Sequence, residues 1–233
     1  VEAAYRAGAR RYFFSSSACA YNTDLQQDPN VRALKETDAY PAMAERGYGW
    51  EKLVSEMFCQ EYWAERGLKT AIARFHNVYG PHGTWDGGRE KAPAALCRKV
   101  IEAIDKKTGK IDIWGDGTAT RSFMYIDDCA QGIDMIMHCD NLIATPINLG
   151  SSELVSINEL LTKIEKIAGV KMNRKYDLNA PQGVAGRNSD NTFIKNTLKW
   201  EPNTKLDKGL AETYAWIKQQ YAKRKAGKRV GVG

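Results

Sequence analysis

Long apolar runs are absent from this 233-residue sequence, so it predicts no membrane-spanning helix. The first residues also lack a basic segment followed by an apolar stretch, and we expect no secretory signal peptide. Cysteine is scarce: five residues lie far apart, and none has metal-ligand spacing, which argues against a zinc site and against a disulfide framework. We therefore expect a protein without a metal, in a reducing, cytoplasmic setting.

Basic residues without neighbouring acids cluster only near the C-terminus. The formal net charge is +6, and five basic residues lie within the last eleven positions, where no acid is found. Without these five charges the net charge would be +1, so the rest of the chain is nearly neutral. Nucleic-acid-binding motifs are missing, and we interpret residues 226–233 as a solvated basic tail, not a nucleic-acid site. The five residues are Lys223, Arg224, Lys225, Lys228 and Arg229.

The first third of the chain alternates strand and helix patterns. An apolar run at 11–17 ends in small polar residues, as a buried parallel strand does where it opens onto a site. Helical spacing of apolar residues follows over 48–65, and a second apolar run covers 70–75. This order predicts an α/β fold with a parallel sheet and crossover helices. A short helix over 1–8 precedes the unit, and 20–46 has the composition of a loop.

Turn and capping signals divide the rest of the chain into shorter elements. We predict a Gly-rich loop over 82–91, and a helix that Asp127 or Asp128 caps and that ends near residue 138. Ser156 and Glu159 form a capping box for a helix that runs to 168. The remaining predicted elements are helices over 92–104, 191–198 and 207–224 and strands over 111–114, 121–126 and 146–150.

A glycine-rich dinucleotide loop is missing from the sequence. A Rossmann fold opens with a strand and a G-x-x-G-x-x-G loop at a helix N-terminus, where the backbone cradles a pyrophosphate. No strand–glycine–helix unit of this kind occurs here, and Gly87-Gly88 follows no strand. We therefore expect a chain that starts at the second half of such a fold, as an N-terminally truncated form would.

Tyr48 and Lys52 lie four residues apart on the predicted helix and so share one face. A phenol has a pKa of about 10 and is a weak base at neutral pH, but an ammonium group beside it stabilises the phenolate. Such a pair can take a proton from a sugar hydroxyl while a hydride leaves the same carbon. The same spacing also fits an exposed surface pair, so this interpretation depends on the surrounding motifs.

Those motifs follow one another in a recognisable order. Ser15-Ser16-Ser17 precedes the pair, and Arg74-Phe75-His76-Asn77-Val78-Tyr79-Gly80-Pro81 follows it. Over roughly residues 1–220 the chain resembles the extended short-chain dehydrogenase/reductase family, whose members act on nucleotide sugars. Later parts of the match are Gly115–Phe123, Tyr125–Asp128, Asp190-Asn191, Leu198–Pro202 and Gly209-Leu210.

The resemblance implies a domain plan and a cofactor. Residues 1–80, joined by 122–150, would form the remaining half of a Rossmann-type NAD-binding domain, while 81–121 and 151–225 would form a smaller α/β substrate-binding domain. NAD is the implied cofactor, and Tyr48 and Lys52 are among the residues that would bind it. Family members commonly dimerise through the helix that carries the tyrosine, so a homodimer is a possible assembly.

A smaller set of residues resembles the GDP-mannose 3,5-epimerase branch of this family. It includes Cys19 after Ser17-Ala18, the stretch Arg89–Ala95, and Gly186–Asn191. The resemblance implies that Tyr48, with Ser17 and Lys52, oxidises carbon 4 of the sugar. Cys19 as thiolate would then remove a proton beside the new ketone, and Lys91 as ammonium would return one on the opposite face. GDP-mannose would become GDP-L-galactose.

The same resemblance implies the substrate contacts. Arginine suits a diphosphate because its planar guanidinium binds two oxygens at once. Simpler interpretations are a helix-dipole role for Glu90, a packing role for Cys19 and surface ion pairs for the arginines. Another NAD-dependent nucleotide-sugar epimerase or decarboxylase remains an alternative, as does a catalytically incomplete fragment. The implied sugar- and diphosphate-binding residues are Asn77, Glu90, Lys99, Arg121 and Arg187.

Overall fold

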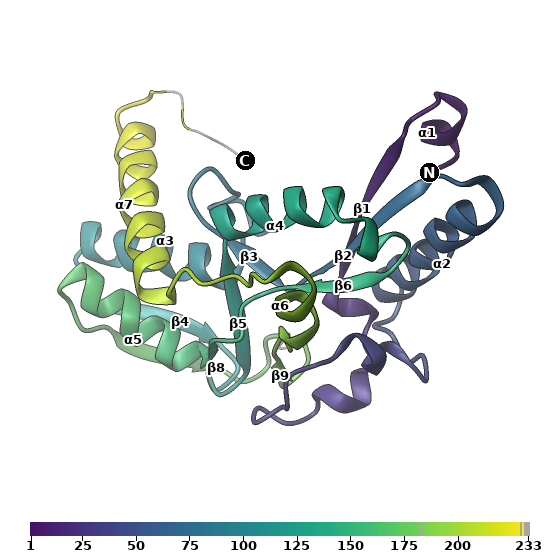
Figure 1. Ribbon diagram of the computed structural model, residues 1–233. Helices are drawn as coiled ribbons and strands as arrows, with labels where there is room; N and C mark the ends of the chain where they lie inside the picture. The colour runs from purple at the N-terminus through teal and green to yellow at the C-terminus, as the bar shows by residue number, and fades with distance from the viewer. Residues whose placement is uncertain (182, 229, 231–233) are drawn as a thin grey trace.

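The computed structural model describes residues 1–181, 183–228 and 230. At its centre, strands β1 (Arg11–Ser17), β2 (Lys69–Phe75) and β6 (Pro146–Leu149) form a parallel sheet in the order β1-β2-β6 (Figure 1). The register pairs Arg11 with Lys69 and Ser17 with Phe75. Because the strands are parallel, the polar residues that follow them meet at one edge of the sheet, as the α/β pattern predicts.

Helices cover both faces of this sheet. Thr70 donates its hydroxyl to the Cys59 carbonyl on helix α2 (Tyr48–Arg66) at 2.9 Å, so α2 lies on the face of even-numbered β2 residues. The odd-numbered Ala71 and Ala73 pack in one buried cluster with Ile136 of α4 (Ile126–His138). Side chains alternate between the two faces of a strand, so α2 and α4 lie on opposite sides. Helix α6 (Thr192–Leu198) also packs on β6.

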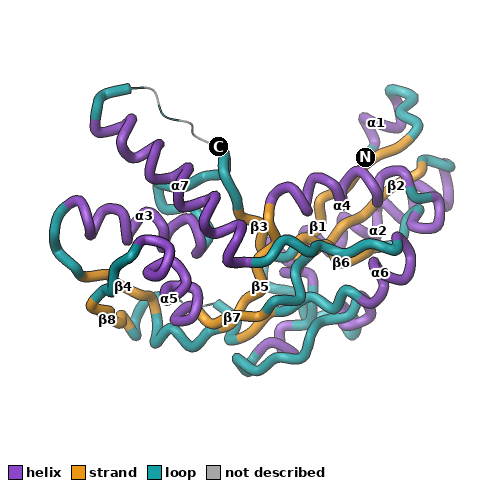
Figure 2. Tube along the Cα trace, turned by 60° about the vertical axis from the view of Figure 1, so that its left-hand side comes forward, coloured by secondary structure: helices purple, strands orange, loops and turns teal. Residues whose placement is uncertain are grey.

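A second group of elements lies beside the sheet, as Figure 2 shows. Strands β3 (Asn77–Tyr79), β5 (Thr120–Tyr125), β7 (Leu154–Ser156) and β9 (Gly186–Arg187) form one small sheet. Strands β4 (Lys110–Trp114) and β8 (Asn173–Asp177) form another. Helices α3 (Ala92–Asp105), α5 (Ile157–Ala168) and α7 (Leu206–Lys225) pack together over them.

The long elements agree with the sequence predictions. The strands at Arg11–Ser17 and Lys69–Phe75 and the helix that starts at Tyr48 are confirmed. The capping box is also confirmed, because Ser156 Oγ accepts the Glu159 N–H at 3.1 Å and Glu159 Oε2 accepts the Ser156 N–H at 2.7 Å. Helix α1 (Glu2–Arg6) precedes Gly8, whose φ of +72° suits a residue without a Cβ.

Several local predictions are wrong. Neither Asp127 nor Asp128 caps α4, because the N-cap residue is Tyr125 and makes no side-chain cap. Asp128 Oδ2 accepts the N–H groups of Asn203 at 3.2 Å and Thr204 at 2.8 Å instead, and so ties the segment before α7 to α4. The segment 20–46 is not all loop. Short 3-10 helices occur at Ala18–Ala20, Thr23–Gln26 and Glu36–Ala39, with a further one at Asp140–Leu142.

The expected solvated tail begins later than the basic cluster suggests. Helix α7 runs through Lys225 and includes Lys223 and Arg224, and two of these three residues make ion pairs. Lys228 is exposed beyond the helix, whereas Arg229 and residues 231–233 lie outside the described residues. The C-terminal basic residues are therefore partly structural.

Two findings concern membranes and metal ions. None of the helices in the described part of the chain is both long and apolar enough to span a membrane. Within the same residues, no group of three or more His, Cys, Asp and Glu side chains is arranged to hold a metal ion. All five cysteines are free thiols.

Candidate active site

Helix α2 begins at the edge of the central sheet, where β1 ends. Gly47, with φ +76°, precedes the helix, and Tyr48 is its first residue. Lys52 Nζ lies 5.3 Å from the centre of the Tyr48 ring and 5.1 Å from that of Phe14. Since 53% of Tyr48 is exposed, the phenol and the ammonium form an accessible pair on one helix face, as the spacing predicts.

The segment that carries Cys19 packs directly against this helix. A Cβ on Gly49 would lie 2.2 Å from the Cys19 carbonyl oxygen, so only glycine permits the observed approach. Ser17, the last residue of β1, accepts the Cys19 N–H on its Oγ at 3.1 Å. Ser17, Cys19 and Tyr48 therefore come together at the carboxyl end of β1.

Arg187 joins this group from the far end of the sequence. Its Nη1 lies 3.4 Å from Cys19 Sγ, its Nε donates to Gln26 Oε1 at 2.6 Å, and its Nη2 pairs with Glu45. Only 9% of the Arg187 side chain is exposed. Reactive cysteines commonly lie beside a cation such as a guanidinium, and Cys19 has one within contact distance.

Arg121 lies next to Arg187 in the parallel register of β5 and β9. Its guanidinium donates to the carbonyls of Thr120 at 2.8 Å and Val184 at 2.6 Å. Burial and the neighbouring Arg187 charge lower the pKa of Arg121 to about 10, which still leaves it charged at neutral pH. Two adjacent positive charges in a partly buried place are suited to an anion with two negative groups.

A pocket of about 400 Å³ opens beside Arg121. Four of the five predicted substrate-binding residues line it, and Arg187 adjoins it through Arg121. Arg121 therefore connects the pocket to the Cys19 group. The residues lining the pocket include Asn77, Glu90, Ala92, Leu96, Lys99, Asp112, Trp114, Ala119, Arg121, Phe123 and Pro181.

The polar residues of the pocket have partners within the chain. Asn77 donates to the Ser122 carbonyl at 3.2 Å, and Lys99 Nζ donates to the Asp112 carbonyl at 2.8 Å. Burial and the nearby Arg98 charge lower the pKa of Lys99. These contacts fix both side chains at the pocket wall. The Asn77 amide and the Lys99 ammonium each use one hydrogen there and keep others to donate to a ligand.

Glu90 and Lys91 lie at the start of α3. Glu90 Oε1 accepts from Arg98 Nη2 and Oε2 accepts the Gly88 N–H, both at 2.7 Å. Burial is the largest single influence and would raise the pKa of Glu90, but the hydrogen bonds from Arg98 and from backbone N–H groups, together with the Arg98 charge, outweigh it and lower the pKa. Lys91 is the N-cap residue of α3 and is exposed between two residues, Glu90 and Ala92, that line the pocket.

Residues 1–150 match the model of the NAD dependent epimerase/dehydratase family. The chain belongs to that family.

Among its relatives, GDP-mannose 3,5-epimerase of Arabidopsis thaliana is 45% identical over 97% of this chain, and GDP-mannose 3,5-epimerase 1 of Oryza sativa subsp. indica is 46% identical over 97%. The chain spans 58% and 57% of these two proteins. The solved structure of UDP-glucose 4-epimerase of Thermotoga maritima with UDP-glucose has a TM-score of 0.79 at 25% identity. That alignment covers 94% of this chain and 67% of the solved one. The α/β Rossmann-type fold is thereby confirmed.

Beneath the candidate site lies a buried polar network that holds the Cys19 segment. Arg74 donates to both Glu56 oxygens, at 2.9 and 2.7 Å, and the Ser16 hydroxyl donates to the same carboxylate. The two charged side chains are only 3% and 2% exposed. Arg74 also donates to the Glu36 carbonyl at 2.6 Å, which ties the loop after Cys19 to the sheet.

Asn148 of β6 extends this network. Its Oδ1 accepts from the Tyr21 hydroxyl at 2.6 Å and from His76 Nε2 at 3.0 Å, and its amide donates to the Leu34 and Asp190 carbonyls. Burial lowers the pKa of His76 to about 4, so its ring is neutral at pH 7. The network joins the two loops that supply Cys19 and Arg187.

Sequence reasoning missed several residues of this site. Gln26 and Glu45 fix Arg187, yet neither belongs to a motif that marked it. Arg98 holds Glu90, and the only sequence signal was its i,i+4 spacing to Glu102. His76, which belongs to the motif after the second strand, is buried in the network just described.

Proposed function

We propose that this chain carries the catalytic residues of an enzyme that converts GDP-mannose to GDP-L-galactose, by transient oxidation at sugar carbon 4 and epimerisation at carbons 3 and 5. The observation that carries the proposal is the 3.4 Å contact between Cys19 Sγ and Arg187 Nη1, beside the Tyr48 helix. It places a cation beside a thiol close to the phenol and ammonium pair. The names of the Arabidopsis and rice relatives support the same substrate.

NAD is the cofactor that this chemistry needs. The residues of this chain fit the part of its site where the hydride is transferred, but not the part that binds the pyrophosphate. Tyr48 and Lys52 present an accessible phenol and ammonium at the carboxyl end of a parallel strand, where α/β folds bind such ligands. No G-x-x-G-x-x-G loop for the pyrophosphate occurs in the sequence. When bound, NAD would accept the hydride from carbon 4 and later return it.

In the proposed mechanism, Tyr48 takes the proton of the carbon 4 hydroxyl while Lys52 stabilises the phenolate and Ser17 orients the hydroxyl. The resulting ketone acidifies the protons on carbons 3 and 5. Cys19 then removes a proton as thiolate, with Arg187 stabilising the negative sulfur. Lys91 returns a proton to the opposite face.

Substrate binding in this proposal uses the pocket and its neighbours. Arg121 and Arg187, side by side on β5 and β9, would bind the diphosphate, while Asn77, Glu90 and Lys99 would bind the sugar or its linkage. We also infer a two-part plan, in which 1–80 and 122–150 bind the cofactor and 81–121 with 151–225 bind the substrate. Helix α6 is an exception, because Ile194 packs with the first part.

Replacing the thiol tests the proposal. In deuterated water with NAD and GDP-mannose, the parent protein should incorporate deuterium at carbons 3 and 5 and release GDP-L-galactose. Cys19→Ala should lose at least about 100-fold in this exchange, as expected for a missing general base. Cys139→Ser, which alters another half-buried thiol, is the matched control.

The outcome also decides between this activity and a 4-epimerase. With NAD as hydride acceptor, Tyr48, Lys52 and Ser17 would also serve oxidation at carbon 4 in a 4-epimerase, and the fold matches UDP-sugar 4-epimerases. Inversion at carbon 4 that survives Cys19→Ala, without exchange at carbons 3 and 5, would overturn the proposal in favour of a 4-epimerase.

We further propose a homodimer through α2. Val54, Met57 and Phe58 are 42%, 51% and 57% exposed on this helix, a contiguous apolar surface of the kind that interfaces cover. Phe58→Lys should convert the dimer to a monomer in sedimentation, and an unchanged sedimentation coefficient would contradict the assembly.

Because a thiol base must stay reduced, the proposal also places the enzyme in the cytoplasm.

A further inference from the structure

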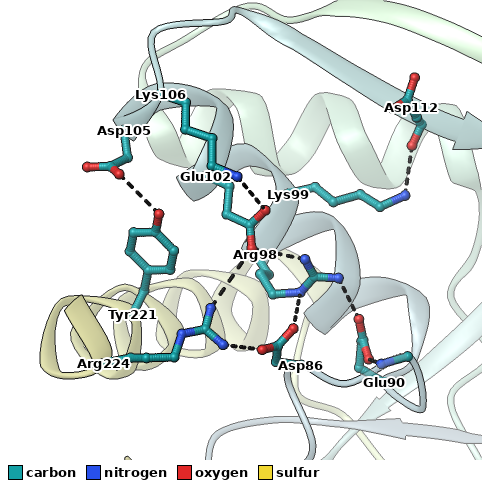
Figure 3. Close-up of polar contacts among 11 residues, drawn as sticks. Asp86, Glu90, Arg98, Lys99, Glu102, Asp105, Lys106, Asp112, Tyr221 and Arg224 are labelled. Atoms are coloured by element: carbon teal, nitrogen blue, oxygen red, sulfur yellow. Dashed lines mark hydrogen bonds and ion pairs between the residues drawn. The ribbon is translucent and has the colours of Figure 1, made fainter. Parts of the chain in front are cut away.

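The loop 82–91 lies between the pocket and the C-terminal helix, and charged side chains connect it to both neighbouring helices (Figure 3). Arg98 of α3 is at the centre. Its Nη2 binds Glu90 at 2.7 Å, its Nη1 binds Glu102 at 3.0 Å, and its Nε lies 3.3 Å from Asp86. One guanidinium thus holds two acids of the loop and one of its own helix.

Arg224 of α7 holds the same loop from the other side. It pairs with Asp86, lies 4.0 Å from Glu102, and its guanidinium carbon is 4.6 Å from the centre of the Trp85 ring. Trp85 is 2% exposed, so the stacked arginine helps to cover it. His82 adds a ring contact with Trp216, also on α7, at 5.3 Å between centroids.

The backbone of the loop supplies little order of its own. It forms no helix or strand, and Gly87 and Gly88 have φ of +95° and +84° with nothing within 4 Å of a Cβ position. Such a segment gains its conformation from its side-chain anchors, because ordering each residue costs about 1–2 kcal/mol of conformational entropy. Here the anchors are Arg98 and Arg224, which we name the arginine clamp.

The segment that the clamp holds ends at the pocket. Glu90 lines the pocket and binds Arg98, and Lys91 follows at the N-cap of α3. Asp86 lies between the two arginines and is bound by both. Asp86, Arg98 and Glu90 thus form a continuous series of contacts from Arg224 to the residue before Lys91.

We propose that Arg98 and Arg224 are positioning residues, and that α7 holds the loop 82–91 so that Lys91 is presented to the substrate pocket. The inference rests on the proposed function for the role of Lys91 as proton donor. It assigns α7, more than 100 residues downstream of the loop, a part in catalysis without contact to substrate or cofactor.

The test compares neighbouring charges on one helix. Arg224→Met removes a clamp residue, whereas Lys225→Met removes an equal charge that pairs with Asp105, outside the loop. Amide hydrogen exchange across 82–91 should be about fourfold faster in Arg224→Met and unchanged in Lys225→Met. With GDP-mannose and NAD, Arg224→Met should lose about tenfold in kcat with less than about a twofold change in KM. Arg224→Lys, which keeps the positive charge, should restore most of the lost kcat.

The two readouts separate this inference from the proposed function. If Arg224→Met and Lys225→Met show the same exchange across 82–91, the clamp is overturned, whatever the enzyme does. If exchange rises while kcat stays at the Lys225→Met value, the positioning role is overturned. Failure of the parent protein to act on GDP-mannose would refute the proposed function, and the exchange data would still decide whether α7 orders the loop.

Discussion

Two clusters of arginine and carboxylate serve the site, and they differ in their exposure to water. The Arg74–Glu56 pair under the Cys19 loop is 3% and 2% exposed, whereas Arg224 of the arginine clamp and its partner Asp86 are 38% and 36% exposed. Inside the protein, an unpaired charge cannot be solvated, so losing a partner is costly. At the surface, water replaces the partner. We therefore expect the buried pair to affect mainly the stability of the whole fold, and the clamp to affect mainly the conformation of one loop.

The largest expected effect is at the buried pair. Arg74→Met leaves Glu56 buried without its cation, and should lower the free energy of unfolding by about 3–5 kcal/mol. Urea titration followed by circular dichroism measures this. The matched control is the double variant Arg74→Met/Glu56→Leu, which removes both charges and should recover much of the loss. A double variant as unstable as the single one would show that packing, not the unpaired charge, dominates.

The buried network should also make stability depend on pH. His76 has a pKa of about 4 in the folded protein against 6.5 as its ordinary value, so only the unfolded state takes up the proton between these values. The contribution of His76 to the free energy of unfolding is therefore fully present above about pH 6.5. It falls as the pH drops toward 4, by about 3 kcal/mol in total. Urea titrations of the parent and His76→Gln from pH 7 to 4 isolate this difference. His138→Gln, at an exposed histidine, should keep the parent slope.

A smaller loss is expected at the centre of the clamp. Arg98 is 17% exposed and its partner Glu90 only 4%, so Arg98→Met should lower the free energy of unfolding by about 1–3 kcal/mol. The same urea titration measures it. Lys163→Met, which breaks the Lys163–Asp207 pair on α5 and α7, should cost less than about 1 kcal/mol. Equal losses in the two variants would remove the distinction between the clamp and an ordinary surface pair.

The smallest effect is at the exposed end of the clamp. Arg224→Met should change the free energy of unfolding by less than about 1 kcal/mol, and the difference from the parent should shrink in 1 M NaCl because salt screens exposed charges. Thermal unfolding at low and high salt measures it. A large, salt-independent loss would mean that the contact with Trp85, not the ion pair, is the main anchor.

The long periodic elements could be predicted from the sequence, because each carries its own signal. Apolar runs marked β1 and β2, and helical spacing marked α2. Strand β8 is almost entirely polar and exposed, and β9 has two residues, so neither has a pattern of its own. They are strands because β4 and β5 pair with them. The cap expected at Asp127 or Asp128 failed because Asp128 binds a distant backbone instead.

The candidate site residues also divide into those that a sequence pattern marks and those that it does not. Motif order led to Cys19, Tyr48, Lys91 and Arg187, whose individual roles stay predictions. The residues that hold them were not foreseen, because contacts such as Arg187 with Glu45 or Arg224 with Asp86 join positions 142 and 138 apart. No local pattern encodes a partner at that separation, and the choice depends on how the elements pack.

The contacts of Arg187 also set an order of events during synthesis. The residue reaches back 168 positions to Cys19, 161 to Gln26 and 142 to Glu45. A nascent chain that already contains Tyr48, Lys52 and the whole β1–α2–β2 unit still lacks the cation beside its thiol until residue 187 has left the ribosome. Cys19 therefore stays without this partner until the residues between the two have been made, and the proposed base gains its cation only when Arg187 packs against it.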